Sequence, residues 1–140
     1  MRILVDTNVI LDYILEREPY NDDAAVIMKA VQEKVVSGCI AAHTITNIFY
    51  ILRKCFTVEA RRELLLELCV LFEVEEIGLK KLRDALHNER FDDFEDCLQM
   101  VCADNFHADY IVTRNIDDFK NSSVQCITPV RFCKLLSDDG

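Results

Sequence analysis

Two kinds of apolar pattern alternate along the chain. Short apolar runs are typical of strands buried on both faces, and apolar residues at every third or fourth position are typical of helices. We predict strands at residues 2–5, 39–42, 71–74, 108–113 and 124–127. We predict helices that begin at Asp6 or Thr7, Asn21 or Asp22, Thr44 or Thr46, Thr57, just after Gly78, at Asp92 or Asp93, and at Pro129. The first should end near Glu16 and the second at Gly38.

This order of elements predicts the fold class. Strands that are separated by helices form mostly parallel sheets, and helices cover such sheets on both faces. We therefore expect an α/β fold with three layers, α/β/α, around a mostly parallel sheet of four or five strands. No repeat or linker divides the 140 residues, so residues 1–140 are predicted to form a single domain.

The composition indicates where the protein is located in the cell and which partners it does not bind. No apolar run reaches the ~20 residues of a membrane span, and residues 1–5 are too short for a signal peptide, so we predict a cytoplasmic protein without a membrane partner. Seven cysteines without a CxxC pair indicate reduced thiols. The net charge of -9 argues against broad adhesion to nucleic acid, although bound cations reverse the field of clustered acids.

Acidic residues stand at the ends of several predicted elements. Asp6 directly follows the first strand, Asp93 and Asp96 begin a long helix, and Asp118 follows the strand at 108–113. The carboxyl ends of strands form the ligand crevice of open α/β sheets. Clustered carboxylates are tolerated when they bind a divalent cation, and Mg²⁺ and Mn²⁺ prefer oxygen ligands. The pattern therefore predicts metal-assisted phosphodiester hydrolysis.

Several polar residues near these ends have two interpretations. Candidates for contact with a substrate phosphate are Asn8, Thr113, Arg114 and Asn115, although Thr113 and Asn115 can instead hold a carboxylate. A helix cap is the alternative for Asp6, Asp92 and Asp93, and a solvated position is the alternative for Asp12. A solvated helix face explains one basic cluster better than an RNA path does; it comprises Arg53, Lys54, Arg61 and Arg62.

Three segments together resemble the PIN-domain nucleases, which include the VapC-type toxins of toxin–antitoxin pairs. They are ILVDTNVILDYIL, DFEDCLQMVCADNFHADYIVTRNIDDF and SSVQCITPVRF. DTN alone is a weak signal, but DTN, DFEDxLQ and TRNxxDF in this order are specific. The resemblance implies a Mg²⁺ or Mn²⁺ site and endoribonuclease activity on single-stranded RNA. It implies catalytic metal ligands at Asp6, Asp96 and Asp118, with Asp93 near them and Asn115 in support.

One position departs from the family pattern. PIN domains usually carry a Glu in the third helix, and the matching segment HTITNIFYILRK has Asn47 there. Asn is neutral and binds a hard cation more weakly, although it can orient a metal-bound water. With Asn47 as the remaining ligand, the resemblance implies a metal site with one fewer negative charge.

Three functions compete at this stage. The first is a metal-dependent ribonuclease that forms a homodimer and is silenced by an antitoxin protein. The second is an inactive RNA-binding or protein-interaction module on the same fold, for which Asn47 is the motivating residue. The third is a phosphatase with Asp6 as nucleophile, which is disfavoured because Asn8 occupies the place of a second acid.

Overall fold

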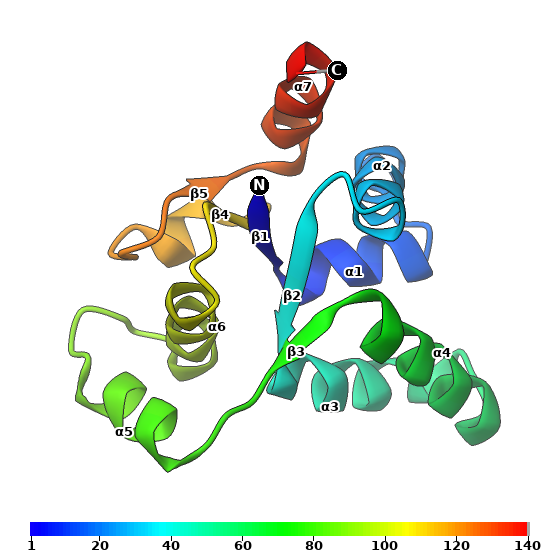
Figure 1. Ribbon diagram of the computed structural model, residues 1–140. Coiled ribbons are helices and arrows are strands. Elements are labelled where there is room, and N and C mark those ends of the chain that lie inside the picture. Colours follow the sequence, from blue (N-terminus) through cyan, green and yellow to red (C-terminus); the bar gives the residue numbers. More distant parts are fainter. Residues whose placement is uncertain (140) are drawn as a thin grey trace.

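A parallel sheet of five strands forms the middle of the molecule (Figure 1). The computed structural model describes residues 1–139. The strands are β1 (Arg2–Val5), β2 (Ser37–Ala41), β3 (Glu73–Glu75), β4 (Tyr110–Val112) and β5 (Cys126–Ile127), in the spatial order β3-β2-β1-β4-β5. Every neighbouring pair is parallel, which confirms the predicted α/β class.

Helices occupy most of the connections between the strands. They are α1 (Thr7–Ile14), α2 (Asn21–Gln32), α3 (Ala42–Ile51), α4 (Val58–Leu71), α5 (Leu79–His87), α6 (Phe94–Asn105) and α7 (Pro129–Asp139), with 3-10 turns η1 (Leu52–Lys54) and η2 (Ile116–Phe119). The order of strands and helices is the predicted one. Two predicted caps are confirmed, since Thr57 caps α4 and Asp93 caps α6 through side-chain oxygens.

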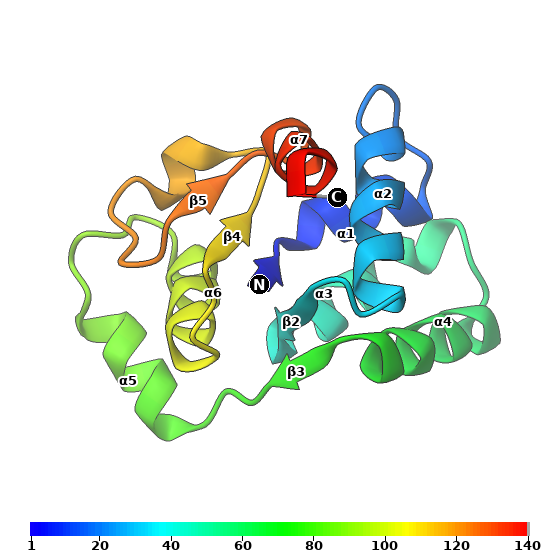
Figure 2. The ribbon, with the colours of Figure 1, turned by 45° about the horizontal axis from the view of Figure 1, so that its top comes forward.

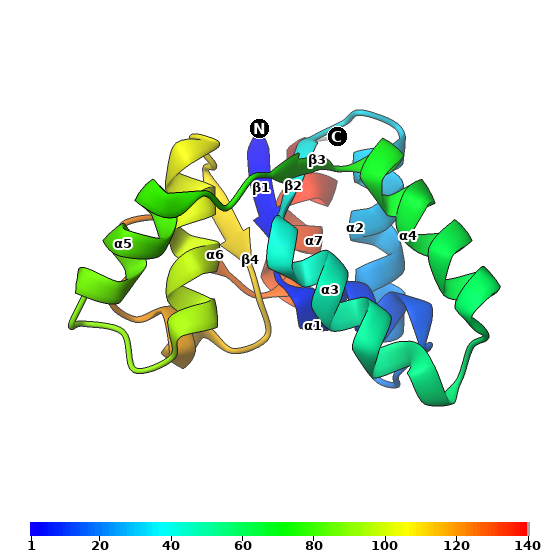
Figure 3. The same ribbon diagram turned by 90° about the horizontal axis from the view of Figure 1, so that it is seen from below.

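Side chains alternate across the sheet and create two cores. Ile3 and Val5 belong to the core under α1, α2, α4 and α7, whereas Leu4 belongs to the core under α5 and α6. Figure 3 shows α5 and α6 on one side of the sheet and α2 and α4 on the other. Figure 2 shows α7 beside α2, against which it packs. The three-layer arrangement is therefore confirmed.

The central strand positions the candidate site. Ile3 of β1 lies opposite Gly38 of β2 and Tyr110 of β4, so β1 has a strand on each side. The chain moves to one side of β1 first and to the other side later, and such a switch point opens a crevice at the carboxyl edge of a sheet. Asp6 is the first residue beyond β1, and its backbone N–H donates to the Val112 carbonyl at 3.0 Å.

Two predicted helix boundaries are wrong. α2 ends at Gln32, and Gly38 instead lies inside β2. A Cβ at Gly38 would lie 3.0 Å from atoms of the Phe72 ring and of Val31, so close packing explains the glycine. α3 begins at Ala42, before Thr44 and Thr46. Thr44 is buried and shares a hydrogen bond of 2.9 Å with the Thr7 hydroxyl, so its polar group serves packing between helices.

Two findings bear on what was inferred from the composition, namely the state of the cysteines and the length of the helices. All seven cysteines are free thiols, and burial raises the pKa of Cys102 to about 11, which makes this thiol a poor nucleophile. Within residues 1–139, none of the helices is long and apolar enough to cross a membrane.

Candidate metal centre

Asp6 is held from two other elements. Its side chain is 5% exposed, and Thr113 Oγ1 donates to Oδ2 at 2.8 Å while Gln99 Nε2 donates to Oδ1 at 2.9 Å. Asp6 occupies the cap position of α1, but its carboxylate makes no capping bond, so the cap interpretation is wrong. These two donors, one to each oxygen, fix the direction of the Asp6 carboxylate.

Asp96 lies among other carboxylates. It follows the capping residue Asp93, whose Oδ1 accepts from the Asp96 N–H at 2.9 Å. Burial raises the pKa of Asp96 to about 7, and the charges of Asp93, Asp6, Asp118 and Glu95 add to this effect. Residues from three separate parts of the chain therefore meet in one electrostatic cluster at the carboxyl edge of the sheet.

This cluster predicts a pH-dependent stability of the metal-free protein. Because the fold raises the Asp96 pKa from 3.8 to about 7, folding favours the protonated form, and the free energy of unfolding should fall between about pH 4 and pH 7. Asp96→Asn should remove this loss and raise Tm by about 3 °C near pH 8. Thermal unfolding in the presence of a chelator measures it. An equal Tm of variant and wild type at that pH would contradict the prediction.

The segment after β4 supplies the third acidic element. Asp118 lies exposed in η2, and its charge contributes to the raised pKa of Asp96. Thr113 is fully buried and accepts from the Asn115 N–H at 3.0 Å while its own proton goes to Asp6. The geometry favours the carboxylate-holding role for Thr113 over a phosphate contact. Asn115 is exposed and Asn8 half-buried, which leaves both predicted phosphate contacts accessible.

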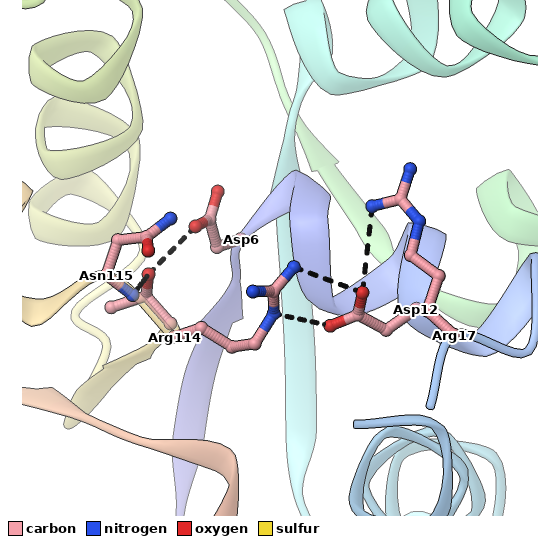
Figure 4. A network of polar contacts seen from close by, with 6 residues as sticks. Asp6, Asp12, Arg17, Arg114 and Asn115 are labelled. Atoms are coloured by element: carbon pink, nitrogen blue, oxygen red, sulfur yellow. Dashed lines mark hydrogen bonds and ion pairs between the residues drawn. The ribbon is translucent and has the colours of Figure 1, made fainter. Parts of the chain in front are cut away.

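Arg114 is engaged away from the acidic cluster. Its Nε and one terminal nitrogen donate to the two oxygens of Asp12 at 2.7 and 3.2 Å, and its guanidinium lies 4.0 Å from the centre of the Tyr20 ring. Figure 4 shows this pair beside Asp6, with Arg17 on the far side of Asp12. Asp12 is 1% exposed, so the expectation of a solvated Asp12 is wrong. The geometry gives Arg114 a structural role rather than the predicted contact with phosphate.

Three residues of the site were not predicted from the sequence. Gln99 holds Asp6, and Glu95 accepts from Asn47 Nδ2 at 3.2 Å. His43 lies near Glu95 and Asp6, and burial lowers its pKa against the opposing effect of these carboxylates. Both ring nitrogens of His43 are buried without a hydrogen-bond partner among the described residues. The helical spacing of Glu95 and Gln99 was the signal available, because residues four apart share a face.

The basic cluster is partly structural. Arg61 is 8% exposed, donates to the Phe49 carbonyl at 2.8 Å and lies over the Phe49 ring. Arg53 lies over the Tyr50 ring at 3.8 Å. A solvated face is therefore the wrong description of Arg61, and its guanidinium is not available to RNA.

A comparison with family models identifies the fold family. The model described as "PIN domain" matches residues 2–117. The chain belongs to the PIN-domain family. The match includes Asp6, Asn47, Asp96 and the segment after β4 as far as Asp117, and it ends one residue before Asp118.

Solved PIN-type structures share the fold at low sequence identity. A toxin–antitoxin complex from Klebsiella pneumoniae matches with a TM-score of 0.69 and 19% identity, over 91% of this chain and 97% of that chain. VapBC2 from Rickettsia felis, bound to a promoter DNA fragment, gives 0.63 and 19%, over 91% and 98%. The sarcin-ricin loop cleaving toxin VapC20 from Mycobacterium tuberculosis gives 0.61 and 17%, over 78% and 86%. A search of the curated proteins found no match.

The donor set of this PIN domain fits a hard divalent cation. No three His, Cys, Asp or Glu side chains within residues 1–139 are grouped tightly enough to hold an ion as they stand. The donors at the cluster are nevertheless carboxylate oxygens, together with Gln99 Oε1, which is buried without a partner among the described residues. Mg²⁺ fits such a set because it needs only one or two carboxylates and keeps several waters.

Proposed function

We propose that this PIN domain is a Mg²⁺- or Mn²⁺-dependent endoribonuclease that hydrolyses single-stranded RNA in the cytoplasm. The observation that carries the proposal is the cluster of carboxylates from three parts of the chain at the carboxyl edge of the sheet, where the charges of Asp93, Asp6, Asp118 and Glu95 add to the effect of burial on the Asp96 pKa. Such repulsion is relieved when a divalent cation binds. The proposed ligands are Asp6, Asp96 and Asp118, with Asp93 and Asn47 at the margin of the site.

Different side chains are proposed to hold the metal ion, to position its ligands and to bind the RNA phosphate. A bound ion would polarise a phosphoryl oxygen and activate a water as nucleophile. Thr113 and Gln99 hold the Asp6 carboxylate in a fixed direction, so it needs little reorganisation to bind a cation. Asn8 and Asn115 offer amide N–H groups that can bind the non-reacting phosphate oxygens. Asp118 completes the set from η2.

Removal of the metal tests the enzymatic proposal. The purified protein should cut a labelled single-stranded RNA in Mn²⁺, and EDTA should lower the rate by about 100-fold or more because the nucleophile depends on the ion. Gel electrophoresis of the products measures the rate, and restoration by excess Mn²⁺ serves as the control. A rate unchanged by EDTA would contradict metal dependence. RNA binding without cleavage at every Mn²⁺ concentration would instead support the alternative, an inactive RNA-binding or interaction module.

An antitoxin protein and a second copy of the chain are the proposed partners. The solved structures with this fold include a toxin–antitoxin complex and VapBC2 on promoter DNA. Several large apolar side chains are exposed on α3 and α4, namely Tyr50 at 63%, Leu66 at 68% and Val70 at 89%. Exposed apolar surface of this kind is typical of interaction sites. Light scattering should give the mass of a dimer, and a monomer mass at high concentration would contradict the homodimer.

A further inference from the structure

A hydrogen bond between Asn47 and Glu95 joins helices α3 and α6. Asn47 Nδ2 on α3 donates to Glu95 Oε2 on α6 at 3.2 Å, although the two residues are 48 positions apart in the sequence. Position 47 is where the PIN pattern usually carries a Glu. The neutral side chain at this position is therefore in direct contact with a carboxylate that comes from another helix.

Glu95 lies at the edge of the acidic cluster. It directly precedes the proposed ligand Asp96 in the first turn of α6, and its carboxylate accepts from Asn47 on α3. His43 stands on the first turn of α3, four residues before Asn47 and on the same face. Glu95 is thus next to Asp96 on its own helix and hydrogen-bonded to Asn47 of the other helix.

Gln99 provides a second and independent indication of a ligand. It lies one helical turn after Glu95, so both share a face of α6. Gln99 is 3% exposed, its Nε2 binds Asp6, and its Oε1 is buried without a hydrogen-bond partner within residues 1–139. A buried acceptor without a partner costs about 1–3 kcal/mol, which a cation or a metal-bound water would offset. The face that carries Glu95 therefore has an open acceptor beside Asp6.

We propose that Glu95 supplies from α6 the carboxylate that α3 lacks, and that Asn47 is a positioning residue that holds it. The proposal rests on the function proposed above, because it assigns Glu95 to the same divalent-cation site. In this arrangement the exchange of Glu for Asn at position 47 moves a negative charge to the neighbouring helix instead of removing it. The Asn47 amide keeps the long Glu95 side chain on the side of α6 that faces α3, which lowers the entropy that binding would otherwise cost.

A swap of the two side-chain types tests the proposal. Mn²⁺ binding to the purified full chain is measured by calorimetry for wild type, Glu95→Gln and the double variant Asn47→Glu/Glu95→Gln. Glu95→Gln should weaken the affinity by about tenfold, and the double variant should return to within about threefold of wild type. Glu67→Gln on α4 is the matched control, because Glu67 is exposed and lies on a helix that supplies none of the proposed ligands. Its affinity should equal that of wild type.

The outcomes separate this inference from the nuclease proposal. If Glu95→Gln binds Mn²⁺ as tightly as Glu67→Gln does, the role of Glu95 is overturned, while Mn²⁺-dependent cleavage by the wild type still supports the nuclease. If the double variant binds no more tightly than Glu95→Gln, the equivalence of the two positions is overturned. If the wild type binds no Mn²⁺, both proposals fail. Glu95 is exposed, so its substitution should leave the fold intact, and an unchanged Tm verifies this.

Discussion

Asp6→Asn is expected to lower the rate of RNA cleavage by about 100-fold or more while the fold survives. The variant removes the one carboxylate of the site that is almost fully buried and bound through both oxygens. The Thr113 hydroxyl can rotate and accept from the new amide, so the hydrogen-bond network can adapt. The loss of one negative charge also reduces repulsion on Asp96. Cleavage of labelled RNA in Mn²⁺ measures the rate, and thermal unfolding tests whether the fold survives.

A matched control distinguishes the loss of a carboxylate at the site from the loss of a carboxylate elsewhere on the protein. Asp22→Asn also removes one carboxylate near the start of a helix, but Asp22 is exposed on α2. This control should cut RNA at the wild-type rate. Undiminished cleavage by Asp6→Asn, measured beside it, would exclude Asp6 from catalysis and with it the proposed arrangement of ligands.

Arg114→Met is expected to lower the free energy of unfolding by about 3 kcal/mol, because it leaves a buried charge without its main partner. Asp12 is 1% exposed, and its remaining cation, Arg17, lies at 3.7 Å in a looser contact. Asp12 lies on α1 and Arg114 directly follows Thr113, so the pair also fastens the segment after β4 to α1. Urea denaturation monitored by circular dichroism measures the change.

Two further variants show whether the loss of stability in Arg114→Met comes from the unpaired charge of Asp12. Arg83→Met on α5 removes an exposed arginine and should change stability by less than about 0.5 kcal/mol. The double variant Asp12→Leu/Arg114→Met removes both charges and should recover most of the lost stability, since apolar pairs often replace buried ion pairs without cost. A loss in Arg114→Met no larger than in Arg83→Met would show that the pair contributes nothing and would reopen the phosphate-binding role of Arg114.

The order of the elements could be predicted because it depends on local patterns. Every strand except β3, whose sequence is Glu-Val-Glu, contains a short apolar run, and caps such as Thr57 and Asp93 lie next to the helices they begin. The position of Asp6 followed from the same logic, because a carboxylate that ends a buried strand lies at the carboxyl edge of the sheet. The resemblance to PIN domains then singled out Asp96 and Asp118 as proposed ligands, which periodicity alone would not have distinguished from the other acids of the chain.

The errors concern partners that are far apart in the sequence. Asp12 lies on a helix in which a polar residue is ordinarily solvated, and only the fold brings it to Arg114, 102 residues later. Arg61 is buried because the Phe49 carbonyl and ring lie against it, which helical periodicity does not encode. Glu95 was missed for a related reason, since its contact with Asn47 depends on how α3 and α6 approach each other.

The two hydrogen bonds to Asp6 also determine when the site can exist during synthesis. Its partners Gln99 and Thr113 are 93 and 107 residues further along the chain. A nascent chain that has left the ribosome only as far as α5 contains the first strand and the first acid, but neither donor and none of the other proposed acidic ligands. Contacts of such long range also form late in folding. The centre is therefore assembled only after the segment that follows β4 has been synthesised, and an N-terminal fragment from interrupted translation would carry Asp6 without an assembled centre.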